Sequence, residues 1–262
     1  MCRWAAYTGA EVFLEDIIST PAHSLIAQSQ KAVECKTATN GDGFGIAWYG
    51  QRPEPGLYRD VYPAWSDCNL RALVHQVQSG LFLAHVRAST GSATSRNNCH
   101  PFTAGKWSFM HNGQVGGFEK FRRHADMSIP DELYEHRRGA TDSEVLFLLA
   151  LQEDLDADPK AALERAVGRM EALSRARGTA PHMRLSVAMS DGQTLFAARY
   201  SSDAIAPSVY YRWSRSLNGW AVVSEPFEHT GEAWSKLRPG EFLTLTSKGA
   251  ETQPFQPFLA DV

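Results

Sequence analysis

The order of strand-like and helix-like segments constrains the fold of this 262-residue chain more than any other feature. Short runs of aromatic and aliphatic residues bounded by Gly, Asn or Asp are typical of strands. Such runs lie towards both ends of the chain, at residues 2–9, 43–50, 81–90, 106–113, 208–214, 219–227 and 241–247. We therefore expect short strands on either side of a middle region that has a different pattern.

The middle region has the spacing of helices. Residues 141–155 contain an unbroken apolar run, and the segment after Pro159 has apolar residues three and four positions apart up to Leu173. A shorter helix is expected at residues 69–78. Strands, then helices, then strands predict an α+β fold in which helices cover largely antiparallel sheets.

The clearest hairpin lies at residues 183–200. Two apolar runs there flank Asp191-Gly192, a pair that a type I′ turn prefers. Long loops are expected at residues 53–56 and 128–139. Because the sequence has no internal repeat and no low-complexity linker, we expect a single domain spanning residues 2–262.

Composition excludes several classes of function. The chain is 43% hydrophobic and 21% charged, which is ordinary for a soluble globular protein. A net charge of −3 argues against a nucleic-acid binder that relies on phosphate contacts. No run approaches the roughly 18 apolar residues of a membrane helix, and no secretory segment is evident, so no membrane association is expected. Cysteines at positions 2, 35, 68 and 99 form no CxxC pair and are too sparse for a disulfide scaffold, which indicates a reducing, cytoplasmic compartment.

Cys2 occupies a position at which a free thiol oxidises unless something protects it or uses it. One interpretation is that Cys2 begins a buried strand, since the residues from Trp4 to Tyr7 are mostly apolar. The other is that Met1 is removed, so that Cys2 becomes a nucleophile with its own α-amine as the base. Both interpretations stay open for this stretch alone.

Two further segments have both a structural and a functional interpretation. Gly41, Gly43 and Gly45 alternate before a strand, but they do not complete a GxGxxG dinucleotide loop. They form either a turn or a close approach to a neighbouring group. His85 and Arg87 share one face of their strand, because strand side chains alternate. Arg87 could grip a carboxylate with its guanidinium fork, or form a structural ion pair.

The stretch His111-Asn112-Gly113 ends the strand expected at residues 106–113. Asn-Gly is a strong turn signal, so a tight turn is one interpretation. The alternative is that the Asn112 amide and the Gly113 N–H converge on one point, as the two donors of an oxyanion hole do.

The stretch from Thr141 to Glu144 fits the capping box that begins a helix. The box does not require Asp142, although an acid in the first turn suits the helix dipole. Asp142 could instead bind an ammonium group of a substrate.

Metal binding is not expected. His85, Cys99, His100 and His111 lie close together in the sequence, but their spacing matches neither CxxC nor HExxH. No cofactor is expected either.

Taken together, these segments resemble the class II glutamine amidotransferases, which are enzymes of the N-terminal nucleophile hydrolase type. The resemblance rests on the order MC, DGFG, AHVRAST, HPF, HNG and TDSE, which spans about the first 150 residues and is more specific than any one motif. It is to the small single-domain members, such as the ergothioneine-pathway γ-glutamyl hydrolase and the amidotransferase-like proteins of glutathione breakdown. It implies a four-layer αββα sandwich of two stacked, mainly antiparallel sheets covered by helices.

The resemblance also implies a role for each candidate residue. Cys2 would be the nucleophile, Arg87 would bind the α-carboxylate of the glutamyl group and Asp142 its α-ammonium. Asn112 and Gly113 would form the oxyanion hole. The expected reaction is cysteine-dependent hydrolysis of the γ-amide of glutamine or of a γ-glutamyl compound through a thioester, releasing glutamate and ammonia or an amine. An unperturbed α-amine has a pKa of about 7.7–8.0, which suits a base at cellular pH.

Two alternatives remain. The chain could be a glutaminase subunit that delivers ammonia to a separate synthase partner, because 262 residues leave no room for a synthase domain. It could also be a non-catalytic binding module, although such a module needs no thiol. The larger synthases have RWATHG where this chain reads RASTG at residues 87–91, and the absence of that Trp leaves the substrate side of the pocket undetermined.

Overall fold

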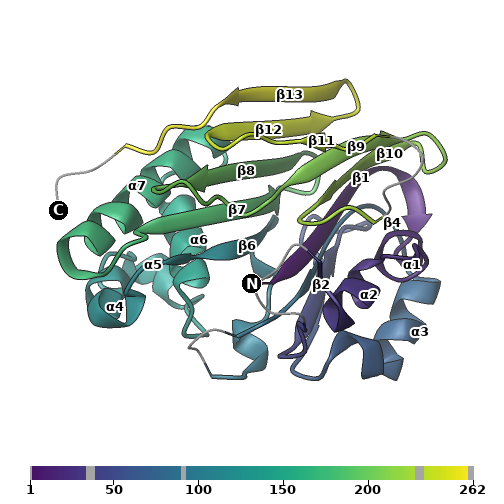
Figure 1. Ribbon diagram of the computed structural model, residues 1–262, viewed down its shortest axis with the longest axis horizontal. Helices are drawn as coiled ribbons and strands as arrows, with labels where there is room; N and C mark the ends of the chain where they lie inside the picture. The colour runs from purple at the N-terminus through teal and green to yellow at the C-terminus, as the bar shows by residue number, and fades with distance from the viewer. Residues whose placement is uncertain (1, 34–38, 90–92, 228–232, 259–262) are drawn as a thin grey trace.

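Two antiparallel sheets carry the fold, and each combines strands from distant parts of the chain (Figure 1). The computed structural model describes residues 2–33, 39–89, 93–227 and 233–258. Within these residues, sheet A has the strand order β11-β9-β10-β1-β4-β2-β3, and sheet B has the order β13-β12-β8-β7-β6-β5. The strands of sheet A are β1 (Arg3–Phe13), β2 (Phe44–Trp48), β3 (Gly56–Asp60), β4 (Gln78–Val86), β9 (Tyr210–Ser214), β10 (Gly219–Val223) and β11 (Ser235–Lys236). Those of sheet B are β5 (Phe102–Ala104), β6 (Trp107–Val115), β7 (Met183–Ser190), β8 (Leu195–Ser201), β12 (Glu241–Thr246) and β13 (Gly249–Pro254).

The helices form two groups, one on the outer face of each sheet (Figure 1). The group on sheet A is α1 (Glu15–Ile18), α2 (Leu25–Gln30) and α3 (Cys68–Gln76). The group on sheet B is α4 (Phe118–Asp126), α5 (Asp131–Tyr134), α6 (Asp142–Gln152) and α7 (Pro159–Arg177). Short 3₁₀ turns lie at Ala64–Ser66 and Arg96–Asn98.

Three apolar clusters fill the three interfaces between these four layers. One joins α1–α3 to sheet A and includes Ala5 and Tyr7 of β1. Another joins α6 and α7 to sheet B. The third lies between the sheets and includes Trp4 of β1 and Met110 of β6. The α+β, αββα architecture expected from the sequence is therefore confirmed.

The predicted hairpin forms, but its turn differs from the prediction. β7 pairs with β8 in a register that joins Ser190 to Leu195, so the connection is the four-residue segment 191–194 and not a two-residue type I′ turn. The Asp191 carboxylate accepts hydrogen bonds from the backbone N–H groups of Gln193 and Thr194, at 2.9 and 2.8 Å. This side-chain capping supports the longer turn, and Gly192 supplies its positive φ of 90°.

Several elements escaped the sequence patterns. Residues 128–139, expected as a loop, contain α5. The helices α1, α2 and α4 and the strands β3, β5, β11 and β13 were not expected. All except α4 have six or fewer residues with no strong apolar periodicity, and their place is set by the sheets that they cover or extend.

Candidate functional site

Cys2 lies at the end of β1, facing the space between the two sheets. Side chains alternate along a strand, and Trp4 belongs to the cluster between the sheets, so Cys2 shares that face. The Cys2 Sγ lies 3.4 Å from the backbone N of Ala88 and 3.6 Å from its carbonyl oxygen. The thiol is only partly buried, and so it lies where a substrate could reach it.

Asn112 lies in sheet B, on the face that is turned towards sheet A. It shares a face of β6 with Met110, which belongs to the cluster between the sheets. Its side chain is 1% exposed, and its Nδ2 has no hydrogen-bond partner among the described residues. A buried amide donor without an acceptor is uncommon in folded proteins, so this donor is available to a ligand.

Residues 111–113 were expected to end a strand, but β6 continues to Val115, and of the two interpretations of this stretch the tight turn is wrong. Asn112 and Gly113 pair with Ser186 and Leu185 of β7, well inside the ladder. Glycine is required at 113 because a Cβ there would collide with the backbone oxygen of Arg184. The Asn-Gly pair thus reflects close packing between strands and not a turn.

The backbone N–H of Gly113 points towards an open strand edge. The N–H of Val115, two residues further on, points away from β7 and donates to the Asp142 carboxylate at 2.8 Å. N–H groups two residues apart on an antiparallel strand point the same way. β5 pairs with β6 only as far as Phe109, so it does not cover this edge at Gly113. The Gly113 N–H and the Asn112 amide are therefore adjacent donors.

Arg87 follows directly after β4 and is held by its backbone. Its N–H donates to the Gly43 carbonyl at 2.8 Å, and its own carbonyl accepts from Asp42 at 3.0 Å. Arg87 as a whole is 3% exposed, and its guanidinium donates to the Asp42 carbonyl and to Ser89 Oγ. Gly43 has a φ of 118°, and a Cβ there would meet the Cys99 sulfur, which explains one of the alternating glycines. Arg87 is thus a fixed cation one strand away from Cys2.

Asp142 begins α6, and Thr141 caps that helix as predicted, with its hydroxyl accepting from the Glu144 N–H. The return half of the capping box does not form. The Glu144 carboxylate instead accepts from the backbone of Arg138 and Gly139 and pairs with Arg137 at 2.6 Å. One Asp142 oxygen holds the Val115 N–H and the other the Ser143 N–H. Asp142 therefore presents a fixed negative charge beside the open edge of β6.

A hydrogen-bonded chain ties the two sheets together behind the thiol. The Trp4 indole N–H donates to Ser186 Oγ at 3.1 Å, and that hydroxyl donates to the Asn112 carbonyl at 3.2 Å. The chain fixes β1 relative to β6, and so fixes Cys2 relative to Asn112. Sequence reasoning missed Ser186, because its partner Trp4 lies 182 residues away in the chain and no local pattern marks such a contact.

Three buried histidines lie close to the charged candidate residues, His85 and His100 near Arg87 and His111 near Asp142. The rings of His85 and His100 stack with centroids 4.4 Å apart, and His100 also stacks on Phe102. Burial, followed by the charge of Arg87, lowers the pKa of His85 to about 3, and burial also holds the pKa of His100 well below its ordinary value. Burial likewise lowers the pKa of His111, against the opposing effect of the Asp142 charge. These rings are therefore neutral at cellular pH.

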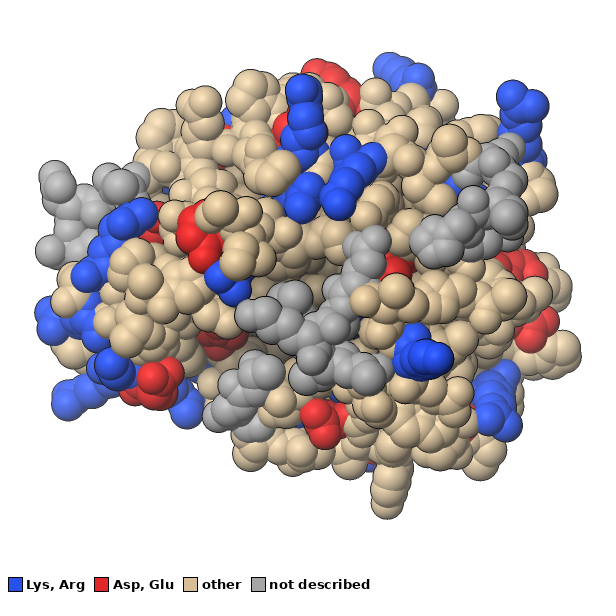
Figure 2. Space-filling model, in the orientation of Figure 1, with Lys and Arg blue, Asp and Glu red and all other residues tan. Residues whose placement is uncertain are grey.

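No metal centre is present in the described part of the chain, where no three His, Cys, Asp or Glu side chains converge. None of the described helices is both long enough and apolar enough to cross a membrane. On the face seen in Figure 2, neither basic nor acidic side chains form a continuous field among the described residues.

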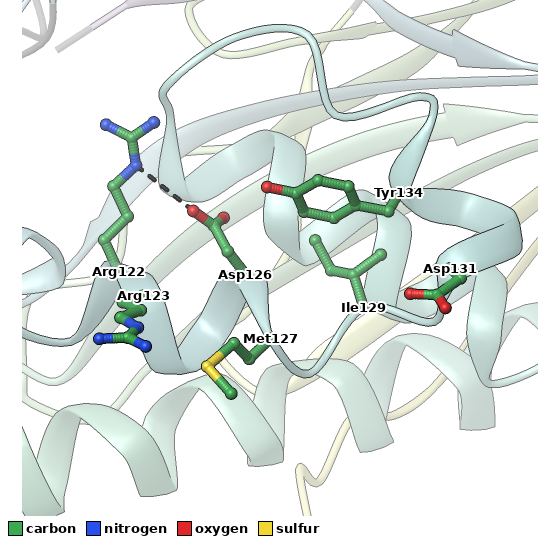
Figure 3. Close-up of a pocket in the computed structure, with 7 residues that line it drawn as sticks. All are labelled: Arg122, Arg123, Asp126, Met127, Ile129, Asp131 and Tyr134. Carbon is green, nitrogen blue, oxygen red and sulfur yellow. Dashed lines mark ion pairs between the residues drawn. The ribbon is translucent and has the colours of Figure 1, made fainter.

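A separate surface pocket lies at α4 and α5 (Figure 3). The Arg122 guanidinium lies 3.5 Å from the Asp126 carboxylate at one side of it, and Met127 and Tyr134 are exposed. Its lining residues include none of the five candidate residues.

Comparison with known proteins identifies the family. Residues 18–209 match the family described as glutamine amidotransferases class-II. The chain belongs to the class II glutamine amidotransferases. Arg87, Asn112, Gly113 and Asp142 lie within the matched residues, and Cys2 precedes them.

Relatives of this amidotransferase include named enzymes, and the chain is an enzyme of this family. It is 32% identical to the probable glutamine amidotransferase DUG3 of Saccharomyces cerevisiae over 94% of this chain and 82% of the relative. It is 26% identical to the gamma-glutamyl-hercynylcysteine sulfoxide hydrolase of Mycolicibacterium smegmatis over 90% of this chain and 92% of the relative.

Solved structures share the fold. A glutamine aminotransferase class-II domain protein from Silicibacter pomeroyi is 58% identical, with a TM-score of 0.82 over 99% of this chain and 100% of that chain. A glutamine phosphoribosylpyrophosphate amidotransferase from B. subtilis is 14% identical, with a TM-score of 0.63 over 98% of this chain and 49% of that chain. The second likeness concerns the fold alone.

Proposed function

We propose that this amidotransferase hydrolyses the γ-amide of glutamine or of another γ-glutamyl compound, with Cys2 as the nucleophile. The observation that carries the proposal is the buried Asn112 amide nitrogen, which has no hydrogen-bond partner among the described residues and lies on the face of β6 that is turned towards sheet A. Family membership supports the reaction class. The names of two relatives, a glutamine amidotransferase and a gamma-glutamyl hydrolase, support a γ-glutamyl substrate.

Arg87 and Asp142 are the proposed grip on the substrate. The glutamyl α-carboxylate would lie against the Arg87 guanidinium, whose planar fork suits a carboxylate. The α-ammonium would lie against the Asp142 carboxylate. Both side chains are already held by backbone hydrogen bonds, so binding requires little reorganisation of the site.

The chemistry would proceed by acyl transfer to sulfur. Once Met1 is removed, the Cys2 α-amine accepts the thiol proton and the sulfur attacks the γ-carbon, forming a C–S bond. Met1 lies outside the described residues, so its removal is part of the proposal. Negative charge on the amide oxygen would be stabilised by the Asn112 amide and the Gly113 N–H.

The intermediate then breaks down in two steps. The protonated α-amine of Cys2 returns its proton to the nitrogen of the substrate amide, and the C–N bond breaks. Ammonia or an amine departs, and a γ-glutamyl thioester remains on Cys2. Water, deprotonated by the same amine, attacks the thioester, and glutamate is released with the thiol restored. The proposed cycle uses neither a nucleotide nor a metal.

The test is glutamate release by the protein lacking Met1, in the presence of EDTA, from glutamine and a panel of γ-glutamyl amides. We expect at least one compound to be cleaved by the chain alone. Cleavage that begins only when a synthase is added would favour the ammonia-delivering subunit instead. A protein that cleaves no compound under either condition contradicts the proposal.

A further inference from the structure

The candidate residues lie unevenly around the Cys2 thiol. Arg87 follows β4, the neighbour of β1 in sheet A on the side of β2. Asp142 holds the Val115 N–H on the edge of β6 that faces away from β7. Both groups assigned to the glutamyl α-carbon therefore lie on one side of the Cys2–Asn112 pair, the side of β4 and β5.

This asymmetry fixes the direction of the leaving group. The acyl chain and the amide nitrogen extend from the carbonyl carbon in different directions. If the acyl chain runs towards β4 and β5, the nitrogen and its substituent point towards β7. This step rests on the proposed function, because it uses the roles assigned there to Arg87 and Asp142.

The register of sheet B shows what lies on that side. Asn112 pairs with Ser186 of β7. The next residues on the same face are Gln114, towards the C-terminal end of β6, and Arg184, towards the N-terminal end of β7. These two residues also pair with each other. This second row is polar and follows the oxyanion donor along the strands, with Arg184 on the β7 side.

Arg184 is held in place by Asp203. Its Nη2 lies 2.6 Å and its Nε 3.2 Å from one oxygen of the Asp203 carboxylate. The other oxygen accepts a hydrogen bond from Ser201 Oγ at 2.5 Å. The Arg184 side chain is only 13% exposed. One edge of the guanidinium is thus occupied, and Nη1 donates to no acceptor among the described residues. Gln114 is exposed beside it.

We propose that Arg184 and Gln114 form a leaving-group subsite that takes a carboxylate. The preferred substrate is then a γ-glutamyl amide whose amine is an amino acid or a short peptide. A carboxylate can accept from Arg184 Nη1 and the Gln114 amide, and charge-assisted hydrogen bonds are the stronger kind. Ammonia and simple alkylamines have no group that reaches this row.

The experiment compares γ-glutamylglycine with γ-glutamylglycinamide, which has almost the same size and lacks the terminal charge. We expect the wild-type enzyme to prefer the acid by about tenfold in kcat/KM, the usual scale of one hydrogen bond to a charged group. In Arg184→Gln the preference should disappear. In Arg238→Gln, which changes a distant exposed arginine paired with Glu241, it should persist.

The outcomes separate this inference from the proposed function. If the wild-type enzyme cleaves both compounds equally well, or if Arg184→Gln keeps the preference for the acid, the subsite is wrong and the proposed function stands. If neither compound nor glutamine is cleaved, both are wrong. The wild-type comparison needs no variant, and a thermal melt of Arg184→Gln distinguishes a lost contact from a lost fold.

Discussion

At the scale of single residues, Asn112 is a group whose burial works against folding. A buried amide donor without an acceptor costs about 1–3 kcal/mol, and the Asn112 Nδ2 is such a donor in the described structure. A function in binding an oxyanion would explain why that cost is tolerated.

Asn112→Leu separates the two effects. The variant replaces an unpaired amide with an apolar group of similar volume, so we expect the free energy of unfolding to stay the same or rise. The kcat for a γ-glutamyl amide should fall about 100- to 1,000-fold, as it does when an oxyanion donor is removed. Urea unfolding and steady-state kinetics measure the two quantities. A stable variant with normal kcat would remove Asn112 from the reaction.

The cysteines should differ sharply in reactivity. Burial raises the pKa of the Cys99 thiol to about 11, so it holds little thiolate at neutral pH. A glutamine-like electrophile should label Cys2 first, ahead of Cys99 and the exposed Cys68. Peptide mapping after short exposure measures the order, and Cys68→Ala is the control that should keep both labelling and turnover. Equal labelling of the three thiols would contradict a special role for Cys2.

At the scale of elements, a buried ion pair anchors the start of β1. The Arg3 guanidinium lies 2.9 Å from the Glu225 carboxylate, and each side chain is 1% exposed. Glu225 follows β10 and also holds His23, at 2.6 Å, and the backbone of Val33. The pair therefore fixes the residue next to Cys2 against two other segments.

Removing one partner of this pair should be costly. Glu225→Gln leaves a buried guanidinium without its counter-charge, so we expect a loss of about 3–5 kcal/mol in the free energy of unfolding. The matched control is Glu153→Gln, which breaks a partly exposed pair with Arg165 and should cost no more than about 1 kcal/mol. Urea titration of both variants gives the comparison, and equal losses would show that Glu225 is not a special anchor.

The elements also show what local sequence can predict. The apolar run before residue 152 and the Thr141 cap predicted α6 to within a few residues, because both signals act within the helix itself. The Asn112-Gly113 pair suggested a turn that does not form, because glycine is needed there to avoid a collision with the Arg184 backbone on β7. Ser186 gave no signal at all. Positions determined by partners far away in the chain are those that local patterns cannot supply.

Each of the five candidate residues was singled out within its own segment, but only the joint order of the motifs favoured a functional role over a structural one. That order located Arg87 and Asp142. In the structure, Ala88, the neighbour of Arg87, contacts the Cys2 sulfur, and Asp142 binds the backbone of Val115 on the strand that carries Asn112. It carried no information on the leaving-group side, because Arg184 and Gln114 meet only through the register of β6 and β7.

At the scale of the whole molecule, the buried histidines make stability depend on pH. The pKa of His85 falls from 6.5 to about 3 on folding, so between these values the unfolded chain binds more protons than the folded one. Stability is then complete above pH 6.5 and is lost as the pH falls towards 3. His100 acts in the same direction.

We therefore expect the free energy of unfolding to fall by about 1 kcal/mol per pH unit for each such histidine between roughly pH 6 and 4. His85→Gln replaces the ring with a polar side chain of similar size that cannot titrate. It should reduce this slope by the contribution of one histidine, because one proton fewer is taken up on unfolding. Urea unfolding at several pH values measures the slope. A slope identical to that of the wild-type protein would show that His85 is not buried as a neutral ring.

The central claim is that an acyl group passes through the sulfur of Cys2, at a site assembled from both sheets. The most direct measurement is mass spectrometry of the N-terminal peptide after the enzyme lacking Met1 is mixed with a γ-glutamyl amide and quenched in acid during turnover. The account predicts that this peptide begins at Cys2 and carries one glutamyl group, which hydroxylamine removes, and that Cys2→Ala shows neither adduct nor glutamate release. Glutamate release by Cys2→Ala at the wild-type rate, or steady turnover by protein that uniformly retains Met1, would contradict it.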